Sequence, residues 1–154
     1  MIYKSRMTAQ ISGEFAVFMI GMRINKPWMV HKWIPVLRAM PKMLNELYSD
    51  SEMGLLSHEM WFSRTLVLVQ YWRSIDQLLD YAKRRDSAHL PAWQAFNRSV
   101  GCDGTVGIWH ETYKAGPGSY ESVYINMPAF GLGKAGDLLE AKGNLKSASN
   151  RIHR

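Results

Sequence analysis

The residues best suited to chemistry in this sequence are histidines with apolar neighbours. His89 precedes Trp93 and Phe96 by four and seven residues, which places the three side chains on one face of a helix. A neutral imidazole in an otherwise hydrophobic slot can coordinate haem iron. Trp93 and Phe96 would form walls of that slot. A lone histidine on such a face is more often structural. His89 is therefore a candidate iron ligand, weighed against that plainer role.

A second histidine, His110, lies in a segment that alternates as a strand does. Ile108 falls on the same strand face as His110, whereas Glu111 falls on the opposite face, so His110 and Glu111 do not form a pair. If the Ile108 face lines a pocket, His110 is a candidate general acid or base near neutral pH. A buried, hydrogen-bonded structural imidazole agrees equally well with the pattern.

Other candidates have less support. Arg73 closes an aromatic strand, where a guanidinium can anchor a carboxylate or a propionate, although a plain surface cation is the commoner case. His58 beside Glu59 is a weaker acid or base candidate, and Cys102 has no nearby base. The histidines come from separate segments without metal-ligand spacing, so a zinc site is not expected. Motifs of dinucleotide binding, nucleotide hydrolysis and serine hydrolysis are absent from the sequence.

Periodicity predicts the elements that position these residues. Ser74 and Gln77 form a capping box before a helical run, and Pro41 should kink or interrupt the first helix. The expected elements are a strand over 14–24, a helix over 30–48, a hairpin from 54–62 and 65–72, a helix after Ser74, a short helix carrying His89, and a last hairpin from 105–113 and 120–127.

This order predicts an α+β fold, a ferredoxin-like βαββαβ arrangement with an added strand. The 14–24 strand is apolar on both faces, so the sheet face without helices also needs a cover. Packing of two sheets in a homodimer, a dimeric α+β barrel, is the simplest cover. We expect an N-terminal arm over 1–13, the domain over 14–135 and a partly helical or mobile tail over 136–154.

Composition limits the function classes. The 154 residues are 47% hydrophobic and carry a net charge of +6, which fits one globular domain. The basic residues form no track with stacking aromatics, so no nucleic acid partner is expected. The longest nearly apolar run, over 15–22, is too short to span a bilayer, and no secretion signal is present. With its single cysteine, the sequence predicts a cytoplasmic protein without a membrane partner.

Four segments resemble a known family. They are YWRSIDQLLDYA from Tyr71, HLPAWQAFN from His89, GIWHETY from Gly107 and YINMPAFGL from Tyr124. Together they resemble the monooxygenase-like family of small dimeric α+β-barrel proteins, long catalogued as a domain of unknown function, which includes a polyketide monooxygenase of fumagillin biosynthesis. The resemblance covers roughly residues 14 to 135. It implies the fold, while the superfamily hosts both cofactor-free oxygenases and haem enzymes.

The same residues are more distantly similar to aldoxime dehydratases, which are haem enzymes of that superfamily. The resemblance implies that their proximal iron ligand matches His89 and that their distal catalytic histidine matches His110. This chain is less than half as long as those enzymes, and it has Met127 where they have other residues.

The sequence thus favours an enzyme that binds haem b and acts, in a monooxygenase-like or aldoxime-dehydratase-like way, on a small hydrophobic substrate. In this hypothesis His89 is the iron ligand and His110 the acid or base. Arg73 anchors a propionate or the substrate, and Trp93, Phe96 and Ile108 form the apolar walls. Two alternatives stay open: a cofactor-free monooxygenase in which His110 deprotonates the substrate, and a non-enzymatic ligand-binding dimer.

Overall fold

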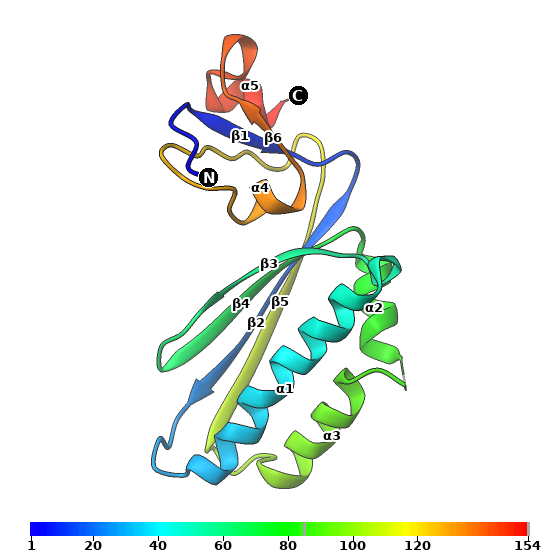
Figure 1. The fold of residues 1–154 in the computed structure, drawn as a ribbon. Coiled ribbons are helices and arrows are strands. Elements are labelled where there is room, and N and C mark those ends of the chain that lie inside the picture. The colour runs from blue at the N-terminus through cyan, green and yellow to red at the C-terminus, as the bar shows by residue number, and fades with distance from the viewer. Residues whose placement is uncertain (85, 154) are drawn as a thin grey trace.

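The structure is a computed structural model that describes residues 1–84 and 86–153 (Figure 1). Its elements are β1 (Met7–Gln10), β2 (Phe15–Ile24), α1 (Val30–Ser49), β3 (Leu55–Trp61), β4 (Thr65–Trp72), α2 (Ile75–Lys83), α3 (His89–Ser99), β5 (Val106–Ala115), α4 (Leu132–Ala135), β6 (Asp137–Glu140) and α5 (Ala148–Ile152), with short 3-10 turns at Ser51–Met53 and Gly143–Leu145. No helix in the described ranges is long and apolar enough to cross a bilayer.

The main sheet is antiparallel and has the strand order β3-β4-β2-β5. With α1 between the first two strands of the sheet along the chain, and α2 and α3 before the last, this is the ferredoxin-like arrangement. All three helices lie on one side of the sheet (Figure 1). The predicted α+β, ferredoxin-like fold is confirmed, and the sheet of this chain is open.

Helix α1 runs from Val30 to Ser49 without interruption, although it contains Pro35 and Pro41. An interruption of the helix at Pro41 is therefore wrong, and the alternative of a kink stays a prediction. Both prolines are exposed, while Leu44 and Leu47, on the turns that follow, are buried against the sheet. Burial of this apolar stripe compensates for the backbone hydrogen bond that a proline cannot donate.

Half of the capping box that was predicted for α2 is present, namely the cap that Ser74 provides. The Ser74 hydroxyl accepts a hydrogen bond from the Gln77 backbone N–H at 3.1 Å, which satisfies one of the free donors at the helix start. The Gln77 side chain instead donates to the Glu52 carbonyl at 2.9 Å. Ser74 therefore caps the start of the helix, and the Gln77 side chain attaches the helix to the turn before β3.

The core under the helices joins the two central strands to α1 and α2. Trp72 is 1% exposed, and its indole donates to the Gln70 side chain at 2.9 Å. The buried members of this cluster, which we call the helix-side core, are Ala16, Leu44, Leu47, Leu55, Leu68, Trp72, Leu78 and Tyr81. Burial of this cluster is the main source of stability for the helix layer.

The last predicted hairpin is wrong. Residues 120–127 form no strand of the main sheet and make only two isolated bridges, Tyr3 with Met127 and Met7 with Tyr124. The Tyr120 ring packs edge-on against Phe15 at 5.0 Å, so the segment crosses the start of β2 instead of extending along β5. Its alternating pattern reflects this packing, and the added strand of the prediction is not in the sheet.

The two chain ends pair with each other. Residues within the expected arm form β1, residues within the expected tail form β6, and the two strands make a separate antiparallel sheet. Thr8 and Ala9 of β1 are fully buried. Arg151 of α5, 2% exposed, donates to the Glu121 carboxylate at 2.8 Å and to the carbonyls of Leu145 and Lys146. The division of the chain at residues 13 and 135 stays a prediction.

The C-terminal third covers one end of the sheet face that lacks helices. Phe15 is buried there with Leu132, while Val17, Tyr71 and Tyr124 pack around them. Glu59 of β3 fixes this cover, because its carboxylate lies 2.8 Å from the Lys134 amine and accepts the Gly131 N–H at 3.0 Å. Part of the cover that was expected from a second copy is therefore supplied by the chain itself.

A matched pair of leucines tests the helix-side core. Leu47→Ala should lower the free energy of unfolding by about 2 to 5 kcal/mol, because Leu47 is 2% exposed. Leu79→Ala removes the same atoms from a side chain that is 45% exposed, and should cost less than about 1 kcal/mol. Urea unfolding followed by tryptophan fluorescence measures both, and equal losses would contradict this core.

Candidate functional site

His89 is the first residue of α3, and its ring lies beside the helix-side core. The imidazole and the Tyr81 ring have centroids 6.1 Å apart. The Nδ1 atom of His89 is buried and has no hydrogen-bond partner among the described residues. Because native proteins satisfy nearly all buried polar atoms, an unpaired ring nitrogen marks a place where a partner is missing.

Glu46 of α1 holds the backbone immediately before His89. Its Oε2 atom accepts the Tyr81 hydroxyl at 2.9 Å and the Ala88 backbone N–H at 2.9 Å. Burial, and then the hydrogen bond to Glu46, raise the pKa of the Tyr81 phenol above its usual value, so the hydroxyl stays protonated as the donor. One carboxylate thus joins α1, α2 and the start of α3. No pattern in the sequence indicates this residue, because its partners come from two other elements.

Of the three residues that were predicted to form the apolar walls of the haem slot, Trp93, Phe96 and Ile108, two lie in the core and one lies at its edge. Phe96 and Ile108 each pack against a second core cluster, whose buried members are Met22, Val100 and Val106. Trp93 stacks on Phe96 at a centroid distance of 5.6 Å and an interplanar angle of 18°, but it is 46% exposed. Phe96 and Ile108 are therefore fixed in the core, whereas Trp93 lies at its outer edge.

His110 lies on the same face of β5 as Ile108, as alternation predicted, and this face is on the helix side of the sheet. It pairs with Ile20 across β2, and its ring lies 5.7 Å from the Phe18 ring. Phe18 packs against the same helix-side core that contains Tyr81, so the rings of His110 and His89 both border this core. His110 is exposed. Its strand neighbour Glu111 lies on the opposite sheet face, as predicted.

Arg73 follows β4 and is exposed. Its backbone N–H donates to the Gly54 carbonyl at 2.8 Å, which fixes the chain where the strand ends and α2 begins. The structure gives no side-chain contact that tests its predicted role as an anchor.

A Tyr–His pair at the sheet edge has more structure around it than the sequence indicated. The Tyr48 hydroxyl and the Nδ1 atom of His58 are hydrogen-bonded at 2.7 Å. Partial burial lowers the pKa of His58 and raises that of Tyr48, so both groups favour their neutral forms. The pair comes from α1 and β3, which is why His58 appeared isolated in the sequence.

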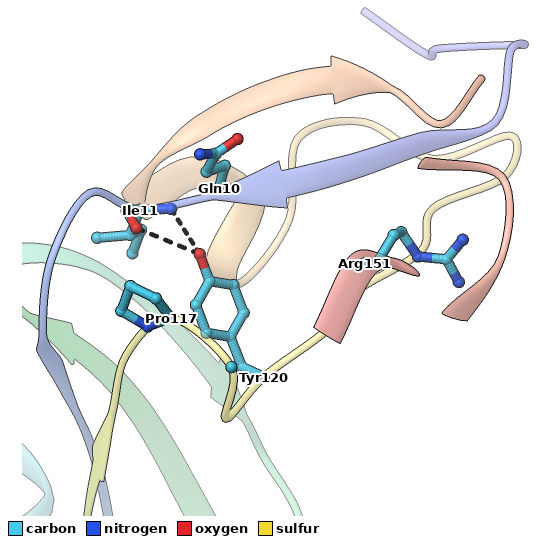
Figure 2. Close-up of a pocket in the computed structure, with 6 residues that line it drawn as sticks. Gln10, Ile11, Pro117, Tyr120 and Arg151 are labelled. Carbon is cyan, nitrogen blue, oxygen red and sulfur yellow. Dashed lines mark hydrogen bonds between the residues drawn. The ribbon is translucent and has the colours of Figure 1, made fainter. Parts of the chain in front are cut away.

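The described residues form several hollows, of which the following two bear on the candidate residues. One, shown in Figure 2, is lined by Gln10, Ile11, Pro117, Gly118, Tyr120 and Arg151. The other is lined by Glu52, Met53, Gln77, Asp80, Tyr81 and Arg84. In the first, the Tyr120 hydroxyl accepts the Ile11 N–H at 2.9 Å (Figure 2). Neither hollow is lined by His89 or His110, and no group of three or more metal-binding side chains occurs in the described ranges.

The strand order and the single helix layer define the class of the protein as a ferredoxin-like α+β domain. Within that class the family is shown by sequence, since the family model Monooxygenase af470-like matches residues 15–132. The chain belongs to the monooxygenase af470-like family. The resemblance seen in the sequence segments is thereby confirmed.

One sequence relative agrees with this assignment, and solved structures of other proteins are similar to this chain. Monooxygenase af470 of Aspergillus fumigatus is 26% identical over 156 residues, covering 86% of this chain and 54% of that protein. Aldoxime dehydratase superimposes with a TM-score of 0.68 and 17% identity, over 86% of this chain and 41% of the dehydratase. SnoaB, a cofactor-independent oxygenase from Streptomyces nogalater, gives a TM-score of 0.46 and 12% identity over 68% of this chain and 94% of SnoaB. The chain spans about half the length of the first two proteins.

Removal of the Glu46 carboxylate should loosen the start of α3. Glu46→Ala leaves the Tyr81 hydroxyl and the Ala88 N–H without their acceptor, and should lower the free energy of unfolding by about 1 to 3 kcal/mol. Amide hydrogen exchange at Ala88 should also become faster. Glu52→Ala, which removes an exposed carboxylate, is the matched control. Equal stability and equal exchange in the two variants would show that Glu46 does not hold α3.

Proposed function

We propose that this protein is a monooxygenase-type enzyme for a small hydrophobic substrate, with haem b held by His89. The family match supports oxygenation as the reaction class. The buried, unpaired Nδ1 atom of His89 is the observation that supports a bound group at α3. Dehydration of aldoximes has less support, because the likeness to that enzyme at 17% identity is a likeness of fold.

The residues around His89 suit a haem group. An iron-bound imidazole uses one ring nitrogen for the metal and normally the other for an orienting hydrogen bond. The buried Nδ1 atom of His89 has no hydrogen-bond partner among the described residues, so it is free for one of these two roles. Phe96 and Ile108 would give the macrocycle an apolar wall, with Trp93 at its edge. Arg73 would pair with a propionate. When bound, haem would supply the iron that activates dioxygen.

The protein's own groups would position and protect the reaction. Glu46 holds the first turn of α3 and thereby fixes the backbone that carries His89. The apolar side chains of Phe96 and Ile108 keep water from that part of the core. His110 is exposed and borders Phe18, so its imidazole can take a proton from a bound substrate and pass it to solvent. Cys102, an exposed free thiol, fits the cytoplasm that we propose as the compartment.

A cofactor-free oxygenase is the second candidate. In that reaction His110 alone deprotonates the substrate, which then reacts directly with dioxygen. The exposure of His110 beside Phe18 supports this candidate, whereas the two hollows do not separate the candidates, because neither is lined by His89 or by His110. The two mechanisms agree on the fold and on His110 and differ only in the role of His89.

Titration with haemin separates the two candidates. The wild-type protein should develop a Soret band with a one-to-one end point, and His89→Ala should weaken haemin binding at least about tenfold, since the iron loses its protein ligand. His31→Ala, a change at an exposed histidine of α1, should bind as the wild type does. A colourless wild-type protein that remains active would support the cofactor-free candidate, and an unchanged band in His89→Ala would reject this ligand.

We also propose that the protein is a homodimer that packs the uncovered part of its sheet against a second copy. On this part of the sheet face, Val69 of β4 pairs with Met19 of β2, and Val67 of β4 pairs with Gly21 of β2. On its other side, Gly21 pairs with Trp109 of β5. The C-terminal cover does not include these residues. They form an apolar surface between the strands, of the kind that isologous dimers bury.

Substitution at the centre of this surface tests the dimer. Val69→Glu places a charge in the expected interface and should convert a dimer to a monomer in gel filtration with light scattering. Leu139→Glu, on the exposed side of β6, should leave the dimer intact. A wild-type protein that is monomeric at all concentrations would contradict the proposal.

A further inference from the structure

One end of the main sheet brings three loops together. The Ile24 N–H donates to the Arg64 carbonyl at 3.1 Å, and the Arg23 guanidinium donates to the Thr65 hydroxyl at 2.8 Å. The Asn25 N–H donates to the Thr105 carbonyl at 3.0 Å. The β2–α1 loop, the β3–β4 turn and the start of β5 are therefore fixed against one another. They lie away from the end of the molecule that holds both chain termini (Figure 1).

Large apolar side chains on these loops are exposed. Trp28 is 75% exposed and Phe62 is 71% exposed, and Val30 at the start of α1 is 43% exposed. Trp28 and Phe62 lie four and two residues from the hydrogen-bonded pair Ile24 and Arg64, so the two aromatic rings extend from adjoining loops. We call Trp28, Phe62 and the cations Arg23, Lys26 and Arg64 the aromatic tip.

The charged side chains around the aromatic tip are mostly basic. Residues 15–45 contain five Lys or Arg residues and no Asp or Glu, and residues 60–75 contain two Arg residues and again no acid. Asp103 is the nearby acid, and its carboxylate lies 3.5 Å from the Lys32 amine. After this pairing, Arg23, Lys26 and Arg64 still give the tip a positive potential.

We propose that the aromatic tip docks on the surface of a membrane that contains anionic lipid. Tryptophan and phenylalanine on a protein surface insert at the boundary between headgroups and acyl chains, and neighbouring Lys and Arg side chains are attracted to anionic headgroups. The tip combines both features on loops that backbone hydrogen bonds hold in place. This inference replaces the sequence-based expectation of no membrane partner, which considered only spanning segments and basic tracks. It is independent of the haem proposal.

Vesicle cosedimentation of the full chain tests the inference. The protein should sediment with vesicles of phosphatidylcholine and phosphatidylserine, and less with phosphatidylcholine alone. The double variant Trp28→Ser, Phe62→Ser and the single variant Arg64→Glu should each lower partitioning onto the anionic vesicles at least about fivefold. These positions are exposed, and an unchanged circular dichroism spectrum and melting temperature would confirm that the variants fold.

Matched controls separate the tip from general surface properties. Ile125→Ser removes a 57% exposed apolar side chain elsewhere, and Lys4→Glu changes the net charge as Arg64→Glu does. Both controls should bind vesicles as the wild type does. The inference is overturned if Lys4→Glu loses as much binding as Arg64→Glu, or if neutral and anionic vesicles bind equally. It is also overturned if the double variant keeps its vesicle binding but changes from dimer to monomer in gel filtration, since the tip would then be a protein interface.

Discussion

The structure depends on the central strand β2, which is apolar on both faces. On one face Ala16, Phe18 and Ile20 require the helix layer, and on the other Phe15, Val17 and Met19 require a second cover. A strand with two apolar faces cannot face water on either side, so the fold has to be built as layers. The helices supply one layer, and the C-terminal third supplies part of the other.

The candidate site follows from the helix layer. Its histidines are carried by α3 and β5, and both rings border the helix-side core, one beside Tyr81 and the other beside Phe18. Glu46 links the helices at the point where α3 begins. Packing that stabilises the fold therefore also sets the positions of the groups proposed for chemistry, so that changes in the core should affect function before the fold is lost.

Local patterns predicted the elements well where the signal is contained in one segment. The 65–72 strand and the Ser74 cap are examples, because alternation and capping depend on neighbours in sequence. The sequence also placed His110 and Glu111 on opposite faces correctly. Interactions between distant segments could not be predicted in this way: Glu46 with Ala88, Tyr48 with His58, and β1 with β6 each join parts of the chain that share no local period. The error at 120–127 has the same cause, since its alternation serves contacts with β1 and Phe15.

The pairing of β1 with β6 has a consequence for synthesis. Translation makes Met7–Gln10 well before its partner strand Asp137–Glu140, because the strands and helices of the main sheet lie between the two in the sequence. Until β6 is made, Thr8 and Ala9, which are fully buried in the finished fold, lack the cover that the pairing of β1 with β6 provides. The nascent chain can form its sheet and helices early, but the edge of β1 stays open until β6 emerges, and that edge is where a chaperone would be needed.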